Sequence, residues 1–321
     1  MKFLSREKEF FRLIEKKKWF VFLFLLLLFL PADNFYEQIR RQTKEPLVET
    51  QEVNFSEPAD YPVNQTEAPA PALTATSAMV IDLASRTILL SKNAGARLAP
   101  ASTTKIMTAV VALENYQLED VLTVPDLTGL EGRQMGLVTG EKLTVRTLLY
   151  GLLVHSGNDA AYTLAANYLS GIGEFIYSMN QKARELNLKN TRFTDVSGLD
   201  QDNHYTSVYD LVQLTAYALG NPVFKEMVAV KTIVVQDIDQ QYEHQLEATN
   251  ELLDQVLGVK GVKTGWTENA GECLVAYTER NGRELLIVVL GSADRFGETE
   301  KLINWVFNNF HWQAIIRSTP N

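Results

Sequence analysis

The feature that most constrains the fold of this sequence is a long helical block with strand-like segments on both sides of it. Two such segments precede the block and three follow it, so one antiparallel sheet assembled from both ends of a domain would let all five pair. We therefore expect an α/β (α+β) architecture, in which a five-stranded antiparallel sheet is flanked by helices and carries a helical subdomain. The strand-like segments are residues 79–85, 86–93, 262–267, 272–280 and 283–292.

Apolar residues recur at helical spacing through the block, and each apolar stripe predicts an amphipathic helix. The turn at Asn281-Gly282, between the last two strand-like segments, is typical of a type I′ hairpin. The block should therefore form a layer of helices against the sheet. The predicted helices begin at Thr103 and then cover residues 144–154, 160–170, 175–187, 209–219 and, after the last strand, 299–310.

The N-terminus differs in kind from the rest of the chain. Residues 1–18 contain seven Lys or Arg against three Glu, and residues 19–30 form an uncharged apolar run. This run is shorter than the roughly 20 residues that span a bilayer as a helix, which favours the core of an export signal. No convincing cleavage site follows, so we favour an uncleaved signal anchor in the cell membrane, with the basic segment inside and the rest of the chain outside. A protein secreted after signal cleavage is the alternative.

Residues 32–76 are rich in Glu, Pro, Thr and Gln and poor in aliphatic side chains. Such a segment cannot bury enough apolar surface to fold, and we expect a disordered extracytoplasmic linker. The chain then has four parts, which are a cytoplasmic basic segment with its hydrophobic anchor (1–31), the linker (32–76), a folded domain (77–312) and a C-terminal tail (313–321).

Charge and composition exclude several classes of function. The net charge of -9 and the pI near 5.1 leave no basic stripe for phosphates, so we expect no nucleic-acid partner. The single cysteine, Cys273, excludes an internal disulfide, a thiolate zinc cluster and a CxxC redox pair, and its strand-like surroundings indicate a buried structural thiol. The four histidines show no HxxxH spacing. We therefore expect neither a metal nor an organic cofactor.

Lys105 stands where a helix does not favour a lysine. A cation in the first turn faces the positive end of the helix dipole, where a carboxylate would be stabilising. Ser102 and Lys105 are spaced i and i+3 at the edge of the apolar side of the predicted helix, so the amine can reach the serine oxygen. If this turn is desolvated, the pKa of Lys105 falls, and its neutral amine can act as a general base for Ser102.

Two more short motifs follow in the same domain. SGN at residues 156–158 lies between two predicted helices, and KTG at residues 263–265 lies on a predicted strand. Alone, the first indicates a turn with helix caps, and the second a strand at which glycine admits a close neighbour. Lysine and threonine beside that glycine also suit an anionic ligand. An isolated SxxK would by itself indicate only a helix cap followed by an indifferent lysine.

Together and in this order, SxxK on a helix, SxN on an interhelical loop and KTG on a strand are the signature of penicillin-recognising serine enzymes. The sequence resembles the low-molecular-mass penicillin-binding proteins, specifically the D-alanyl-D-alanine carboxypeptidases, from about Ala78 to Phe310. The resemblance includes LAPASTTKIMTA, SGNDAA, TRFTDVSGLD, NHYTSVYDL and KTGWTENAGECLV. It implies a β-lactamase/transpeptidase-like fold, with residues 77–312 as the penicillin-binding domain and the active site between the sheet edge and the helical block.

The resemblance implies a serine peptidase that removes the terminal D-alanine of peptidoglycan stem pentapeptides and is covalently inhibited by β-lactams. Ser102 would attack the D-Ala-D-Ala carbonyl to form an acyl-enzyme, and Lys105 would accept its proton. Ser156 would relay a proton to the nitrogen of the leaving D-alanine. Asn158 would hydrogen-bond the substrate amide and help to fix Lys105.

The resemblance also implies how the terminal carboxylate of the substrate is held. Lys263 would keep Lys105 neutral by charge repulsion and, with Thr264, would bind that carboxylate. Gly265, in the same motif, would let the substrate backbone approach the strand. Arg295, in SADRF, matches a family arginine near the carboxylate.

Backbone N–H groups of Ser102 and Trp266 would form the oxyanion hole, worth about 3 kcal/mol for each donor. Many relatives carry histidine immediately after KTG, whereas this chain has Trp266. The backbone donor is retained there, but the bulky ring would alter access and substrate preference. Asp159, which follows the SxN asparagine, is predicted to be a helix cap and not a catalytic acid.

Three other functions remain open. A D,D-endopeptidase that cuts peptide cross-links would use the same motif residues. A class A β-lactamase would need a glutamate in an ExxLN-like segment, but the only Leu-Asn pair after the SxN loop is Leu186-Asn187, and the position that requires glutamate holds Ala183. A non-catalytic domain that senses β-lactams or the wall would be acylated without cleaving a peptide.

Overall fold

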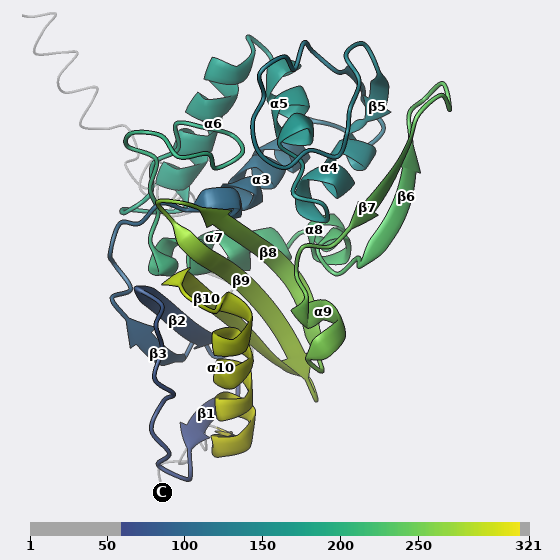
Figure 1. Ribbon diagram of the computed structural model, residues 1–321. Coiled ribbons are helices and arrows are strands. Elements are labelled where there is room, and N and C mark those ends of the chain that lie inside the picture. Colours follow the sequence, from purple (N-terminus) through teal and green to yellow (C-terminus); the bar gives the residue numbers. More distant parts are fainter. Residues whose placement is uncertain (1–58, 315–321) are drawn as a thin grey trace, which may run out of the picture. The chain divides into compact units, whose positions relative to one another are not determined.

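The structure is a computed structural model that describes residues 59–314, and its centre is an antiparallel sheet of five strands. Strands from the two sides of the helical block meet in this sheet, where Ile287 pairs with Val80 (Figure 1). The predicted five-stranded antiparallel sheet is therefore confirmed. In spatial order its strands are β3 (Ile88–Lys92), β2 (Ser77–Asp82), β10 (Arg283–Ser292), β9 (Gly271–Arg280) and β8 (Val259–Thr267).

Both faces of the sheet are buried. In β2, Ala78 and Val80 pack in the same cluster as helix α10 (Arg295–Asn309), whereas Met79 and Ile81 pack with the helical block. Figure 1 shows α10 in front of the sheet and the helices of the block behind and above it. Because both faces are covered, the strands consist of nearly continuous apolar runs.

The turn between β9 and β10 has the predicted geometry. Arg280 pairs with Arg283, so two residues close the hairpin. Asn281 and Gly282 have φ values of 52° and 72°, in the left-handed region that both central residues of a type I′ turn require. The prediction from this dipeptide is confirmed.

The helices of the block follow the apolar stripes of the sequence to within a few residues. Three of them begin after a residue whose side chain caps them: Thr144 accepts from the Thr147 N–H, Ser207 from the Asp210 N–H, and Asn221 from the N–H groups of Val223 and Phe224. The last helix, α10, begins at Arg295, four residues earlier than predicted, because the side chain of Asp294 accepts from the Gly297 N–H. The others are α3 (Lys105–Asn115), α4 (Val145–Leu153), α5 (Asn158–Ala166), α6 (Ile172–Glu185), α7 (Val208–Leu219), α8 (Pro222–Met227) and α9 (Leu252–Gln255).

The segment that was predicted to begin a helix at Thr103 is divided in two. A single 3₁₀ turn, η1 (Ala101–Thr104), comes first, and α3 begins only at Lys105. Ser102 therefore lies outside the α-helix, on a tight turn that Ala101 enters with a φ of 48°. This places the serine at the end of the helix that faces β8.

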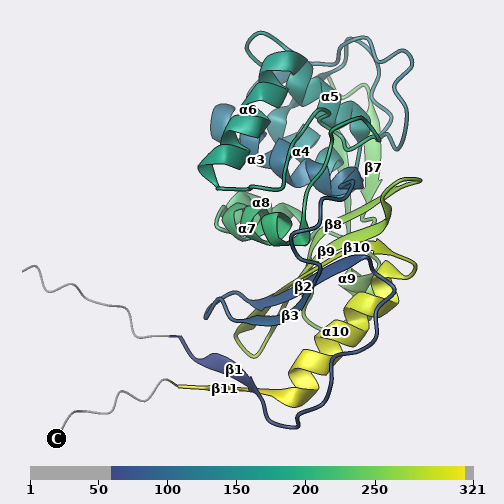
Figure 2. The same cartoon turned by 90° about the vertical axis from the view of Figure 1, so that its left-hand side faces the viewer.

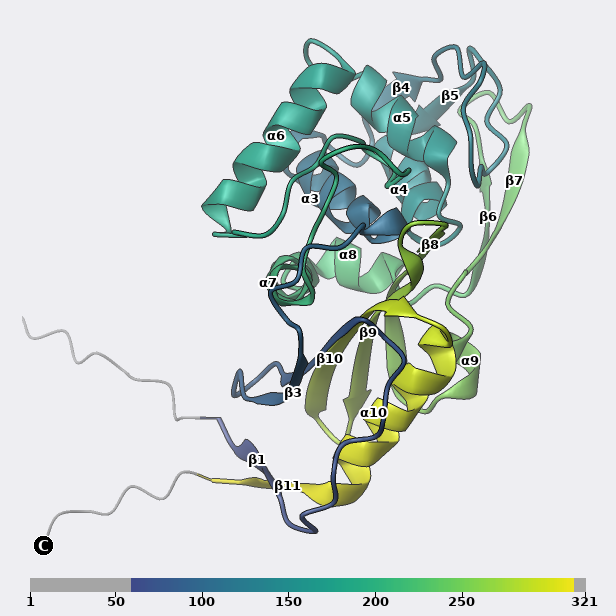
Figure 3. The same cartoon turned by 60° about the vertical axis from the view of Figure 1, so that its left-hand side comes forward.

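Two short hairpins were not predicted, because their strands have only three to five residues. One pairs β4 (Val121–Thr123) with β5 (Lys142–Thr144), and the other pairs β6 (Thr232–Gln236) with β7 (Glu243–Glu247). Figure 3 shows the second hairpin beside the helical block, from where the chain returns to the sheet through α9 and β8.

Part of the predicted linker is folded. Strand β1 (Tyr61–Asn64) pairs with β11 (Phe310–Gln313), which Figure 2 shows side by side. The Ala75 N–H also donates to the carboxylate of Glu298 in α10. The prediction of disorder over 32–76 is therefore wrong for residues 59–76, because their partners come from the far end of the chain and no local pattern reveals them.

The predicted basic segment and signal anchor (1–31), the linker up to residue 58 and the tail from residue 315 lie outside the described residues. No helix between residues 59 and 314 is both long enough and apolar enough to cross a bilayer.

Candidate active site

Seven of the nine predicted site residues line one cavity of about 860 Å³. The cavity lies between β8, the edge strand of the sheet, and the loops of the helical block, as the resemblance implied. Figure 3 shows β8 next to the helical block. The two remaining residues, Lys105 and Lys263, are almost completely buried and do not line it. The seven that line it are Ser102, Ser156, Asn158, Thr264, Gly265, Trp266 and Arg295.

Lys105 is hydrogen-bonded to the candidate nucleophile. Its Nζ is 2.9 Å from Ser102 Oγ, 2.7 Å from Asn158 Oδ1 and 2.7 Å from the carbonyl oxygen of Ser197. A neutral amine can donate two hydrogens and accept one. With Asn158 and Ser197 as the two acceptors, the lone pair remains directed to the hydroxyl of Ser102, which is the geometry of a general base.

Burial makes that neutral amine available. The side chain of Lys105 is completely enclosed, and desolvation lowers its pKa from 10.5 to about 7, although the carboxylates of Asp195 and Asp159 act in the opposite direction. The sequence predicted that repulsion by Lys263 would keep Lys105 neutral. Burial is the largest cause of the lowered pKa of Lys105, and the repulsion between the two amines lowers the pKa of Lys263.

Lys263 is buried in β8, near the other charged groups of the site. Its Nζ donates to the carbonyl of Thr264 at 2.9 Å, and it does not line the cavity. Burial holds the pKa of Lys263 well below its usual value, and the charges of Lys105, Arg295 and Arg133 lower it further. Its contact with a substrate carboxylate stays a prediction.

Ser156 and Asn158 lie on the turn that joins α4 to α5. Ser156 has a φ of 65°, so the chain reverses sharply at the serine. The Nδ2 group of Asn158 donates to the carbonyl of Glu131 at 2.8 Å, and its backbone N–H donates to the carbonyl of Arg133 at 2.7 Å. The turn thus holds both Lys105 and the 131–133 loop, which forms part of the cavity wall.

Asp159 does not cap its own helix in the predicted way. The N-cap of α5 is Gly157, and no side chain bonds there. The buried carboxylate of Asp159 instead accepts from the backbone N–H groups of Met135, Gly136 and Leu137, and from that of Ala160. The carboxylate therefore holds the loop of residues 135–137, and both of its oxygens are occupied by these donors.

Strand β8 approaches the nucleophile very closely. A Cβ atom added at Gly265 would lie 2.9 Å from the Ser102 nitrogen and 2.9 Å from the Ala101 Cβ, so only glycine fits without a shift. This approach brings the backbone of the Ser102 turn against the KTG strand, where the resemblance implies an oxyanion hole. The next side chain, Trp266, is 61% exposed and lines the cavity.

Arg295 is the first residue of α10 and lies at the same end of the sheet. Its Nη1 donates to the carbonyl of Gly265 at 3.0 Å, and its Nε is buried without a hydrogen-bond partner in the structure. The guanidinium thus combines a structural bond to the KTG strand with a position on the cavity wall. Both features suit the predicted role near a carboxylate.

Sequence reasoning missed the loop that supplies the third partner of Lys105. Asp195 accepts from the N–H and hydroxyl of Ser197 and from the N–H of Gly198, while its other oxygen accepts from Tyr162 at 2.9 Å. Burial would raise the pKa of Asp195, but these hydrogen bonds outweigh it and hold the pKa below its usual value. The signal was the local Asp-x-Ser-Gly pattern, which is typical of a side-chain-bonded turn.

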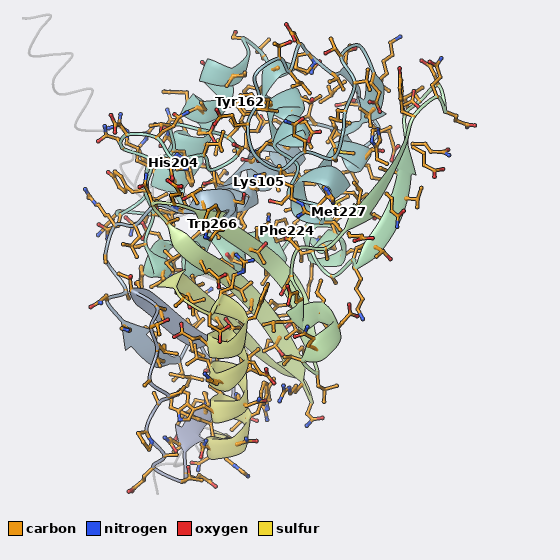
Figure 4. The ribbon with its side chains drawn as sticks, viewed as in Figure 1. Lys105, Tyr162, His204, Phe224, Met227 and Trp266 are labelled. Atoms are coloured by element: carbon orange, nitrogen blue, oxygen red, sulfur yellow. The ribbon has the colours of Figure 1, made fainter. Side chains whose placement is uncertain are left out.

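Gly198 in this loop lies directly against the nucleophile turn. A Cβ atom there would lie 1.9 Å from the Ala101 carbonyl oxygen, and its φ of 92° also favours glycine. Tyr162 and Lys105, which bond to opposite parts of the loop, are labelled in Figure 4.

Between residues 59 and 314, no group of three or more His, Cys, Asp or Glu side chains is placed to hold a metal ion. The lone Cys273 is buried in β9, and burial raises the pKa of its thiol to about 11. The thiol is therefore protonated at neutral pH, in agreement with the structural role predicted for it.

The chain is similar to known proteins in sequence and in fold. D-alanyl-D-alanine carboxypeptidase DacF of Bacillus subtilis is 33% identical over 76% of this chain and 64% of its own length, and DacD of Escherichia coli is 35% identical over 75% and 65%. The chain thus spans slightly less than two thirds of these curated relatives. The crystal structure of the Streptomyces K15 DD-transpeptidase superposes with a TM-score of 0.72 at 32% identity, covering 75% of this chain and all of that one.

The family match covers most of the described domain. Residues 64–294 match the peptidase S11 family, D-alanyl-D-alanine carboxypeptidase, and this range contains eight of the nine predicted site residues, all except Arg295. The fold agrees as well, because the solved relatives have the predicted transpeptidase-like fold. On the sequence match, the fold and the Ser102–Lys105 geometry, the chain belongs to the peptidase S11 family of D-alanyl-D-alanine carboxypeptidases.

Proposed function

We propose that this protein is a serine-type D-Ala-D-Ala carboxypeptidase that removes the terminal D-alanine of peptidoglycan stem pentapeptides. The observation that carries the proposal is the hydrogen bond of 2.9 Å between Lys105 Nζ, whose pKa burial lowers to about 7, and Ser102 Oγ at a cavity wall. A serine hydroxyl beside a buried neutral amine is an activated nucleophile, because the amine can accept the hydroxyl proton.

The reaction follows from the positions of these groups. Ser102 Oγ attacks the carbonyl carbon of the D-Ala-D-Ala bond while its proton passes to Lys105 Nζ. The N–H groups of Ser102 and Trp266 stabilise the negative oxygen of the tetrahedral intermediate. Ser156 passes its hydroxyl proton to the leaving nitrogen, which departs as D-alanine, and regains a proton from Lys105 Nζ, so the amine is neutral again. Water then attacks the ester carbon of the acyl-enzyme and gives a proton to Lys105 Nζ, which returns it to Ser102 Oγ as the shortened peptide leaves.

The substrate carboxylate lies at the end of β8 in this proposal. Thr264 and Arg295 both line the cavity there, and the hydroxyl of Thr264 is 2.6 Å from that of Thr249. A guanidinium and hydroxyl donors on one wall match the carboxylate of a terminal D-alanine. The carboxylate of a penicillin has the same charge, so β-lactams would bind there and acylate Ser102.

The test is the release of D-alanine from diacetyl-Lys-D-Ala-D-Ala by the full chain, with Ser102→Ala as the matched control. We expect release by the wild type and none by the variant, and covalent labelling of the wild type alone by fluorescent penicillin. Labelling of Ser102→Ala would refute this serine as the nucleophile. Labelling of the wild type without D-alanine release would instead favour an endopeptidase or a sensing domain, which a cross-linked peptide substrate would separate.

We also propose that the N-terminal segment holds the protein at the cell membrane with its catalytic domain outside. Seven Lys or Arg followed by the apolar run of residues 19–30 support this orientation. The test is fractionation of cells that express the full chain, followed by extraction of the membranes at alkaline pH. Retention in the membrane is expected. Recovery in the medium, with a new N-terminus beyond residue 30, would show a cleaved signal.

A further inference from the structure

One buried histidine beside the site takes no part in the reaction described above. His204 lies in the segment between Asp200 and α7, and its ring is almost completely buried. Its Nε2 is 2.8 Å from the hydroxyl oxygen of Thr104, in the turn that carries Ser102. Its Nδ1 is 2.9 Å from the backbone nitrogen of Thr194, on the opposite side of the ring. The ring therefore bridges two separate segments.

The chemistry of the two contacts defines the state of the ring. A backbone N–H can only donate, so Nδ1 accepts from Thr194 and the ring proton is on Nε2, which donates to Thr104. Burial lowers the pKa of His204 to about 4, although the carboxylates of Asp195 and Asp200 act in the opposite direction. The ring is therefore neutral at physiological pH, with one donor and one acceptor, and both are used.

The two segments that His204 bridges both contact Lys105. Thr104 directly precedes Lys105, while the 194–199 loop supplies the Ser197 carbonyl that accepts from Lys105 Nζ at 2.7 Å. The imidazole and the lysine thus each connect the nucleophile turn to the same loop by hydrogen bonds. His204 and Lys105 are both labelled in Figure 4.

We propose that His204 is a positioning residue for Ser102 and Lys105, which holds the nucleophile turn and the 194–199 loop in register through Thr104 and Thr194. The proposal rests on the proposed function, because it assigns His204 an effect on acylation. Without the imidazole, the loop and the turn lose a shared partner, and the Ser197 carbonyl is no longer held against the lysine amine. A displacement of a catalytic group by about 1 Å costs on the order of 100-fold in rate.

The test compares the rate constant for acylation by fluorescent penicillin in full chains that carry His204→Leu or His204→Gln. Leucine fills similar space but removes both polar contacts, whereas the amide of glutamine again offers one donor and one acceptor. We expect His204→Leu to acylate about 30- to 100-fold more slowly, at a temperature where the variant is fully folded, and His204→Gln to recover to within about threefold of the wild type. A residue with a merely structural role would lower the melting temperature and leave the acylation rate of the folded protein unchanged.

A double-mutant cycle identifies the contact through which the effect acts. Thr104→Val removes the hydroxyl that accepts from His204, and its loss of rate should not add to that of His204→Leu. Thr215→Val, at a buried α7 threonine whose hydroxyl has no hydrogen-bond partner in the structure, is the matched control and should change little. If His204→Leu does not fold, Thr104→Val is the test by itself, and we expect it to acylate about 30- to 100-fold more slowly than the wild type.

The outcomes separate this proposal from the proposed function. Wild-type acylation with His204→Leu and Thr104→Val both within threefold of it would overturn the positioning role and leave the carboxypeptidase intact. Additive losses in the double variant would likewise overturn it, because the two side chains would then act independently. A wild-type protein that is neither acylated nor able to release D-alanine would overturn the proposed function, and this inference with it.

Discussion

Burial, more than any neighbouring charge, determines the chemistry of Lys105. Two carboxylates, Asp195 and Asp159, lie near enough to raise its pKa, yet desolvation outweighs them and brings the value to about 7. The same balance explains why the nearby carboxylates coexist with a neutral lysine. Each carboxylate accepts hydrogen bonds from backbone N–H groups of a loop, and these bonds stabilise its negative charge.

The first prediction concerns the pH dependence of acylation. The base form of Lys105 exists above its pKa of about 7 and is lost as the pH falls through that value. We therefore expect the rate constant for acylation by penicillin to decrease about tenfold for each pH unit below 7 and to level off above it. Stopped-flow measurements between pH 5 and 9 check this. A rate that is constant from pH 5 to 8 would contradict the assignment of Lys105 as the base.

Removal of the amine gives a second prediction. Lys105→Ala should slow acylation by about 10²- to 10⁴-fold, because that is the usual contribution of a positioned general base. The substitution also removes the buried aliphatic stem of the side chain, so the rates are compared at a temperature where circular dichroism shows that the variant is folded. Lys301→Ala, at an exposed position of α10, is a matched control. A loss smaller than tenfold in a folded Lys105→Ala would return this lysine to a structural role.

The third prediction concerns Arg295. Arg295→Ala should weaken peptides with a free terminal carboxylate by tenfold or more in kcat/KM, and should affect the corresponding C-terminal amides much less. Arg295 also bonds the Gly265 carbonyl, so Arg295→Lys serves as a control that keeps the charge. An equal loss on acids and amides would show that the bond to the strand, and not the carboxylate, explains the effect.

At the scale of elements, the site depends on two close backbone approaches to the nucleophile turn. Strand β8 contacts η1 at Gly265, and the 194–199 loop contacts it at Gly198. Both approaches place a glycine where any side chain would collide with the turn that carries Ser102. The position of the nucleophile is therefore determined by two elements distant in sequence, and not by its own helix.

A fourth prediction follows for these glycines. Gly265→Ala places a methyl group 2.9 Å from the Ser102 nitrogen, so the oxyanion donors must shift. We expect acylation to fall by about 10²- to 10³-fold, as for the loss of one oxyanion donor. Gly173→Ala, in α6, where the φ is not positive and the added Cβ meets no atom within 4 Å, is the control for the loss of a glycine. Equal activities of the two variants would show that β8 does not position the oxyanion hole.

The regular elements were predictable because their patterns are local. The strands of the sheet and the helices of the block each repeat apolar residues at the period of the structure they form, and the Asn281-Gly282 turn has a single favoured geometry. The short hairpins were missed because their strands have only three to five residues, and β1 was missed because its partner, β11, lies far along the chain. Such partners leave no periodic signal within a window of a few residues.

For the whole molecule, the two ends of the described chain stabilise each other. The carboxylate of Glu298 in α10 accepts from the N–H groups of Thr74 and Ala75 and, at 2.6 Å, from the hydroxyl of Ser292. Burial would raise the pKa of Glu298, but these bonds outweigh it and hold the pKa below its usual value. Residues 59–76 therefore complete the domain that the sequence placed at 77–312.

The fifth prediction tests that extension. A fragment of residues 59–314 should melt several degrees above one of residues 77–314, because the shorter fragment leaves the buried Glu298 carboxylate without two of its donors. Both should be acylated at the same rate, since the site lies elsewhere. The difference should shrink as the pH falls below about 4.5, where protonation of Glu298 removes the ionised acceptor. Equal melting temperatures would show that β1 and residues 65–76 add no stability.

The sequence by itself determined the family and the candidate site, because three motifs with fixed spacing mark Ser102, Lys105 and the KTG strand. Local periodicity likewise determined the sheet and the helical block. Only the tertiary structure decided how these groups are tuned. It buried Lys105 and Lys263, brought Ser197 and His204 to the nucleophile turn and folded residues 59–76 against α10. The physical reason is that desolvation and hydrogen bonding depend on neighbours a hundred residues away, which no local pattern specifies.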